Sequence, residues 1–301
     1  EGGVLKNSNG ERFMSRYDPD RMELSTRDVV ARACATEIQE GRGTIHGGVW
    51  LDVSHLPAKR IEERLPVMLE QFLKYGVDIR TQPMEVGPTA HHIMGGLRIT
   101  PFCQTTLPGL WAIGDTSYAG SAWAGAAEAP PGGLRGSGLM NALIAALLAA
   151  PSVARYSKTV PLPVSGQLEI ASLKEKIFAP LKRRNGYSAL EAIRSIQEAV
   201  VPVKYSMRRN KERIEEALSK VAAVRDKLPE LYAEDPHGLG KCHEASCIAL
   251  CAEIGFRAAL ARTESRGWHY REDYPQRDDR NWLRWVIVKK VQENMVISTE
   301  P

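Results

Sequence analysis

The feature that most constrains the fold is a glycine-rich stretch that leads directly into an apolar segment. WAGAAEAPPGGLRGSG precedes LMNALIAALLAA, twelve residues from Leu139 to Ala150. A bilayer span needs roughly 20 residues, so the sequence predicts a buried helix and no transmembrane segment. The first N–H groups of this helix would point into the glycine-rich loop and favour an anion there.

The composition is that of an ordinary globular protein. The 301 residues suffice for two domains, with 43% hydrophobic and 25% charged residues. A net charge of +4, spread over both signs, excludes nucleic-acid binding driven by charge alone.

The cysteines favour a reducing compartment. Five cysteines are too few for a secreted disulfide framework, so a cytoplasmic location is expected. Cys242, Cys247 and Cys251 are spaced so that two of them would share a helix face. Without a CxxC pair or a nearby set of histidines, the sequence predicts no metal site.

The first half of the chain mixes helical and strand patterns. A helix is predicted from Arg27, with Ser25 or Thr26 as its N-cap and glycines at its end. The other expected elements are a strand at Val49–Val53, a helix at Ile61–Gly76, an extended piece at Pro83–Val86 and a strand at Leu110–Ile113 that ends in Gly114-Asp115.

The second half is predicted to be helical. A linker is expected at Pro151–Gly166, which is aperiodic and rich in Pro, Ser and Val. Helical segments are expected near 168–183, 188–200, 206–226, 228–233 and 238–262, with strands at 285–289 and 295–298. Three main helices would form a bundle.

Six blocks in one order carry a resemblance to a known family. They are ERFMSRYDPDRMELSTRDVVARA, LDVSHL, RLPVMLEQFLKYGVDI, PMEVGPTAHHIMGG, PGLWAIGDTS and ESRGWHYREDYPQRDDRNWL. Their order resembles the flavoprotein subunit of the succinate dehydrogenase/fumarate reductase family. L-Aspartate oxidase and the adenylylsulfate reductase alpha subunit belong to the same superfamily.

The resemblance implies an α+β fold that gives way to helices. Family members begin with a Rossmann-like FAD-binding segment that carries GxGxxG, insert a capping domain, return to the FAD domain and end in a helical domain. The chain resembles the part from within the capping domain onward. The implied division is a partial capping domain at 1–82, the returning FAD-domain segment at 83–150, a linker at 151–166, a helical domain with three main helices at 167–265 and a tail with strands at 266–301.

A phosphate-cradling GxGxxG does not occur in this sequence. The chain alone is therefore expected to be a fragment that binds FAD weakly and is inactive by itself.

Oxidation or reduction of a dicarboxylate requires cations for two carboxylates and a proton donor. The resemblance implies that Arg27 transfers the proton, that His91 holds a substrate carboxylate and that Arg135 supplies a third cation. An arginine acid, with a pKa above roughly 12, needs a relay to neighbouring carboxylates. Glu23 is one possible partner, while His92 is interpreted as a packing residue.

The resemblance also implies the FAD contacts. Asp115, after Gly114, would accept a hydrogen bond from the ribityl chain of FAD. The turn at Gly95 and Gly96 would let the backbone approach the flavin, and Ser137 and Leu139 would touch it.

The glycine-rich loop departs from the family pattern. Dicarboxylate reductases carry HGANRLGGNSLLD, whereas this chain lacks the His and Asn and places Arg135 about one position late. Three interpretations therefore stay open: a fumarate/succinate flavoenzyme, an enzyme like adenylylsulfate reductase or L-aspartate oxidase, and an inactive assembly domain.

The resemblance further implies a partner that carries iron–sulfur centres and accepts the electrons. The location would then be cytoplasmic, or peripheral at the inner face of the cytoplasmic membrane through partner subunits.

Overall fold

A computed structural model of the chain describes residues 1–89, 95–118, 137–161 and 166–300, with Ser137, Gln167 and Leu168 described by their backbone alone. The chain divides into two compact units. The first comprises Glu1–Leu97 and Gly114–Ala142, and the second comprises Arg98–Ile113 and Leu143–Pro301.

The first unit is built on a three-stranded antiparallel sheet. Its order is β1 (Val4–Lys6), β2 (Val49–Asp52) and β3 (Met84–Val86), with β2 in the centre. The strands predicted near β2 and β3 are thus confirmed. One core cluster packs α1 (Met14–Tyr17) and α2 (Arg27–Glu37) against this sheet. The short turns η1 (Met22–Leu24) and η2 (Ile38–Arg42) flank α2.

The single helix predicted at Ile61–Gly76 is two helices. The first is α3 (Ala58–Arg64) and the second is α4 (Pro66–Leu73). Leu65 between them has non-helical φ −128° and ψ 37°. Pro66 explains the break, because proline disfavours a helical conformation in the residue before it and suits the first position of a new helix.

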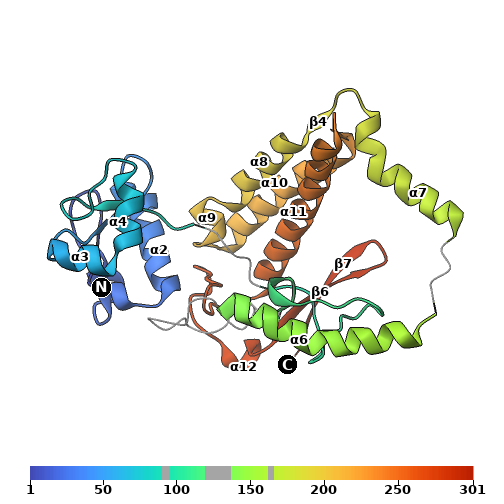
Figure 1. Cartoon of the computed structure of the whole chain (residues 1–301), viewed down its shortest axis with the longest axis horizontal. Coiled ribbons are helices and arrows are strands. Elements are labelled where there is room, and N and C mark those ends of the chain that lie inside the picture. The colour runs from blue at the N-terminus through green and yellow to red at the C-terminus, as the bar shows by residue number, and fades with distance from the viewer. Residues whose placement is uncertain (90–94, 119–136, 162–165, 301) are drawn as a thin grey trace. The chain divides into compact units, whose positions relative to one another are not determined.

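The second unit contains the predicted bundle of three main helices. These are α8 (Ala189–Val200), α10 (Lys211–Lys227) and α11 (Pro236–Ala261), which lie side by side in Figure 1 and pack against one another. Two core clusters join them through small and branched side chains that are fully buried, among them Ile196, Ile214 and Val221.

Shorter elements complete the second unit. They are α7 (Gln167–Phe178), η4 (Ala179–Lys182), α9 (Val203–Ser206), α12 (Asp279–Trp282) and a hairpin of β6 (Trp285–Val291) and β7 (Asn294–Glu300). The two strands predicted near the end of the chain are therefore confirmed, as an antiparallel pair.

The helix predicted at Leu228–Ala233 is wrong for most of its length. A 3-10 turn, η5 (Leu228–Glu230), leads into a short strand, β5 (Leu231–Tyr232). This strand pairs in parallel with β4 (Tyr187–Ser188). The buried Leu231 joins the bundle core, and this tertiary contact favours the extended conformation over the weak local helical pattern.

The helix α6 (Ser137–Thr159) corrects two predictions. It continues through Pro151, so the predicted linker begins after Thr159. The described part of the chain buries only one side of this helix: Ala149 is 5% exposed, whereas Leu139 is 69% and Leu147 76% exposed. The expectation of a buried helix therefore fails within this chain, because the described elements do not cover its apolar surface.

By length and composition, Gly138–Thr159 is apolar enough to cross a membrane. The twelve-residue estimate was too short because the helix runs on through Pro151. A single helix of this kind is weak evidence for a span, since core helices of soluble proteins have the same length and composition.

The strand predicted at Leu110–Ile113 is also absent. Trp111 forms an isolated bridge with Gln104, and the Thr105 N–H donates to the Leu110 carbonyl at 3.0 Å. A strand in the interior of a sheet takes its backbone partners from strands on both sides. Here the neighbouring turn supplies these partners.

Candidate functional site

Two segments that are separate in sequence meet in the first unit. The Leu97 N–H donates to the Thr116 carbonyl at 2.8 Å, and the Tyr118 N–H donates to the Leu97 carbonyl at 3.1 Å. Gly96 permits this approach: its φ is +135°, and a Cβ atom there would lie 2.7 Å from the Thr116 carbonyl oxygen. The pairing therefore depends on glycine at position 96.

The Gly114-Asp115 turn is fixed from within. Gly114 begins the 3-10 turn η3 (Gly114–Thr116) with φ +62°. Its carbonyl accepts hydrogen bonds from the Ser117 N–H at 3.0 Å and from Ser117 Oγ at 2.9 Å. Asp115 lies in this turn, and its short side chain is exposed.

Asp115 faces the beginning of α6. A Cβ atom on Gly138 would lie 3.9 Å from Asp115 Oδ1. The carboxylate thus lies beside the positive end of a long helix, where a negative charge is stabilised. The turn, the carboxylate and the first turn of α6 together offer a hydrogen-bond acceptor and backbone N–H donors in one place.

This arrangement fits the flavin nucleotide that the sequence predicted. Asp115 can accept a hydrogen bond from a sugar-like hydroxyl group. Gly95 has φ +122° with no atom within 4 Å of a built Cβ, and Leu139 is exposed on α6. Asp115 thus lies beside the first turn of α6, and Gly96 lies against the backbone of Thr116 and Ser117.

Arg27 is the first residue of α2, as predicted, and Thr26 is its N-cap. Its side chain is exposed, and no hydrogen bond or ion pair joins it to another residue in the described ranges. Its guanidinium is therefore available to an anionic ligand.

The relay partner considered for Arg27 is occupied elsewhere. Glu23 accepts hydrogen bonds from the Leu5 N–H at 3.0 Å and from Arg12 Nε at 2.9 Å. Burial raises the pKa of Glu23, but these hydrogen bonds outweigh it and lower the pKa. Glu23 therefore stays ionised and bound to Arg12.

Asp28 is also engaged. It lies in the first turn of α2, and its Oδ2 pairs with Arg32 Nη2 at 3.0 Å.

Three of the residues assigned from the resemblance lie outside the described ranges. They are His91, His92 and Arg135. The structure thus brings together the predicted FAD contacts at Gly96, Gly114 and Asp115. The substrate contacts at His91 and Arg135 stay predictions.

Sequence reasoning missed two carboxylates that the structure shows to be completely buried, Glu37 and Glu264. Glu37 is fully buried in the first unit and accepts hydrogen bonds from Arg42 Nε at 2.7 Å, Tyr17 Oη at 2.7 Å and Asn7 Nδ2 at 2.8 Å. Burial raises its pKa, but these donors prevail and lower it to about 2.

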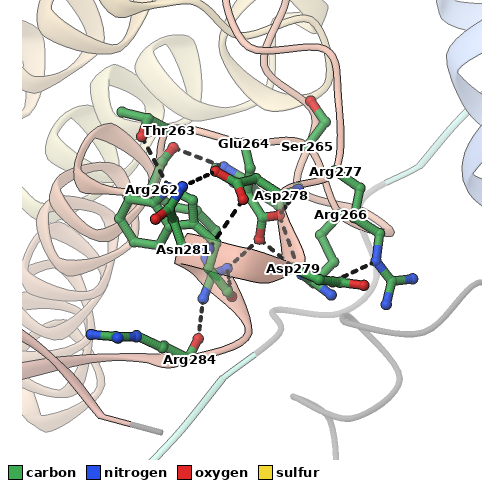
Figure 2. A network of polar contacts seen from close by, with 12 residues as sticks. Arg262, Thr263, Glu264, Ser265, Arg266, Arg277, Asp278, Asp279, Asn281 and Arg284 are labelled. Carbon is green, nitrogen blue, oxygen red and sulfur yellow. Dashed lines mark hydrogen bonds and ion pairs between the residues drawn. The ribbon is translucent and has the colours of Figure 1, made fainter.

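The second buried carboxylate, Glu264, binds two arginines (Figure 2). Arg266 Nε donates to Glu264 Oε1 at 2.8 Å, Arg262 pairs with the same oxygen, and the Asp278 N–H donates to Oε2 at 2.8 Å. Arg266 also reaches Asp279 at 2.7 Å. The network joins the ESRGWHYRED segment to the RDDRNW segment. In the sequence, the high density of charged residues in these segments was the only indication of such a network.

His269 lies close to this network. Burial, reinforced by the charge of Arg209, lowers its pKa to about 3, so the imidazole is neutral. It contacts the Arg262 carbonyl at 3.3 Å. This packing gives His269 a structural role.

Metal ligands do not gather in the part of the chain that the structure describes. There, no group of three or more His, Cys, Asp or Glu side chains is arranged to hold a metal ion.

Comparison with protein families gives two matches. Residues 1–129 match the FAD binding domain family, and residues 195–301 match the fumarate reductase flavoprotein C-terminal family. The first match includes the Gly96–Asp115 region and supports FAD as the cofactor. It also includes Arg27 and His91.

Individual relatives agree with these matches. The chain is 41% identical, over 99% of its length, to a subunit of the CoM/CoB fumarate reductase of Methanothermobacter marburgensis, and it covers 53% of that relative. It is 31% identical, over its full length, to the mitochondrial succinate dehydrogenase flavoprotein subunit of Oryza sativa subsp. japonica, of which it covers 50%. The chain thus spans about half the length of these relatives.

A solved structure shares the fold. A variant of E. coli quinol fumarate reductase superimposes with a TM-score of 0.85 at 26% identity, over 99% of this chain and 54% of that one. The predicted family and cofactor are therefore confirmed.

Proposed function

Because the chain belongs to the succinate dehydrogenase/fumarate reductase flavoprotein family, we propose that it forms the flavin- and substrate-contacting part of an oxidoreductase that interconverts fumarate and succinate. One observation carries the proposal. Gly96 and the Gly114-Asp115 turn were predicted as FAD contacts from separate motifs. The residue after Gly96, Leu97, is hydrogen-bonded through its backbone to Thr116 and Tyr118, and Asp115 lies beside the first turn of α6.

These residues would hold the cofactor from one side. A Cβ atom at Gly95 would meet no atom within 4 Å, so this glycine leaves the backbone open to close approach, and Asp115 would accept a hydrogen bond from a ribityl hydroxyl. When bound, FAD supplies two-electron exchange with the substrate. Backbone N–H groups at the start of α6 favour negative charge at this edge.

Arg27 would act on the substrate as a proton carrier. Its guanidinium is exposed at the start of α2, where the helix dipole also favours an anion. A guanidinium gives up a proton only when another proton replaces it, since its pKa exceeds roughly 12. Because Glu23 is bound to Arg12, we assign the replacing acid to a residue other than Glu23.

His91 and Arg135 would bind the substrate carboxylates. A fixed pair of cations orients a dicarboxylate, which lowers the entropic cost of reaching the reactive geometry. Electrons would pass to a partner that carries iron–sulfur centres, and attachment to a membrane would come through such partners.

The altered glycine-rich loop favours a second candidate. Glu128 and two prolines stand in the approach to Arg135, and the family's His and Asn are missing. A related flavoenzyme for another small anion, like L-aspartate oxidase or adenylylsulfate reductase, would fit this loop.

Turnover tests the proposal in the protein that contains this chain. Fumarate-dependent oxidation of a reduced viologen should fall about 10²- to 10⁴-fold in Arg27→Lys, because a fixed proton donor contributes that much. His91→Ala should raise KM for fumarate. Arg21→Lys, an exposed arginine on the same segment, should leave the rate unchanged. Wild-type turnover in Arg27→Lys and His91→Ala would contradict the proposal.

A further inference from the structure

The five cysteines fall into two classes. Cys34, Cys103 and Cys242 are buried, whereas Cys247 and Cys251 are exposed, and all five are free thiols. Burial raises the pKa of Cys34 to about 12 and also raises the pKa values of Cys103 and Cys242. Thiolate chemistry on the folded chain is therefore concentrated at the exposed pair.

The exposed pair lies on a rigid support. Cys247 and Cys251 are four residues apart within α11, a helix of 26 residues. Residues at this spacing lie one above the other on the same helix face. The opposite face of α11 is anchored in the bundle core through Cys242, Ala245 and Ala249. The separation of the two thiols is thus set by the helix.

The geometry of the helix determines which kind of bridge can link the two thiols. Cβ atoms four residues apart in a helix lie about 5–6 Å apart. A disulfide needs Cβ atoms roughly 3.5–4.5 Å apart, so a direct bond would distort α11. A single atom between the two sulfurs lengthens the bridge and removes this conflict. We propose that Cys247 and Cys251 form a dithiol site for a soft, thiophilic centre such as trivalent arsenic.

The ligand class follows from the donors. Thiolate sulfur prefers soft centres, and two thiolates complete the coordination of an organic trivalent arsenical. Among the described residues no third ligand joins the pair to form a closed metal site.

The reaction with phenylarsine oxide requires no oxidant. Two S–H bonds break, two As–S bonds form, and the arsenic-bound oxygen leaves as water with both protons. The proposal is independent of the flavin site, so it can fail or hold without affecting the proposed function.

The test uses the whole chain and phenylarsine oxide. Native mass spectrometry should show one phenylarsenic group per chain, with the loss of two thiols. Competition with 2-mercaptoethanol should require at least about 100-fold more monothiol for the wild-type chain than for Cys251→Ser, because the second As–S bond is intramolecular. Dithiothreitol should remove the group from both.

Spacing provides the matched control. Cys251→Ser combined with Gly255→Cys keeps two thiols on α11 but places them two turns apart. A side chain at Gly255 meets no atom within 4 Å, so the variant should fold. In this variant the bound phenylarsenic group should no longer resist removal by 2-mercaptoethanol. Equal resistance in the wild-type chain, the single variant and the spacing variant would overturn the proposal, as would modification of Cys242 in the folded chain.

Discussion

The bundle helices and α6 differ in how far their apolar residues are buried. In α8, α10 and α11 the apolar positions meet one another, and Ile196, Ile214 and Val221 are excluded from solvent. α6 is as apolar, yet Leu139 and Leu147 are mostly exposed. Periodicity predicts both kinds of helix, but burial requires a partner surface.

The largest expected loss comes from the charge network beside the bundle. Glu264→Ala should destabilise the second unit by about 3–5 kcal/mol, because Arg262 and Arg266 lose a fully buried partner. Guanidinium chloride unfolding would measure this loss. Glu293→Ala removes an exposed acid and should change stability by less than about 0.5 kcal/mol. Equal losses of stability in the two variants would show that the buried ion pairs of Glu264 do not stabilise the second unit.

The core of the bundle can be compared directly with α6. Ile214→Ala should cost about 2–5 kcal/mol, since it leaves a cavity in a fully buried site. Leu147→Ala should stay within about 0.5 kcal/mol in the same assay, because Leu147 is exposed. A large loss in Leu147→Ala would mean that a partner covers α6 in solution.

Acidification should weaken the two units in different pH windows. His269 has a lowered pKa of about 3, so its contribution is complete above roughly pH 6.5 and is lost as the pH falls toward 3. Glu37 has a lowered pKa of about 2, so its contribution is lost only between roughly pH 4.5 and 2.

Denaturant unfolding at several pH values would measure these windows. His269→Gln should flatten the loss between about pH 6.5 and 4.5, while Glu37→Gln should flatten only the loss below about pH 4.5. If the loss between about pH 6.5 and 4.5 is unchanged in His269→Gln, or the loss below about pH 4.5 is unchanged in Glu37→Gln, the assignment of the two groups is wrong.

The smallest expected effect concerns the two adjacent glycines of the candidate site. Both have positive φ, but only Gly96 places a built Cβ against Thr116 and Ser117. Gly96→Ala should therefore cost about 1–3 kcal/mol more than Gly95→Ala in thermal unfolding of the first unit. Identical costs would show that the Leu97–Thr116 pairing does not need the close approach.

Local patterns predicted much of this fold. The start of α2 at Arg27 and the bounds of α8 and α11 follow from capping residues and periodicity, to within a few positions. Two of the failures share a cause. The burial of α6 and the strand at Leu110–Ile113 depend on neighbouring elements that a local pattern does not contain.

The motif resemblance assigned Gly96, Gly114 and Asp115 to FAD binding, and the structure places these residues near one another; their contact with FAD stays a prediction. The buried carboxylates Glu37 and Glu264 were not predicted, because their partners include residues distant in sequence and an acid in a helical pattern looks like any solvated charge.

The central claim is that Asp115 and its turn form one side of an FAD site. The most direct test is the flavin content of the purified protein that contains this chain, measured by its absorbance near 450 nm relative to protein. Asp115→Ala should lose most of the bound FAD, whereas Asp20→Ala, an exposed acid in the same unit, should keep it. Full FAD occupancy in Asp115→Ala would contradict the account.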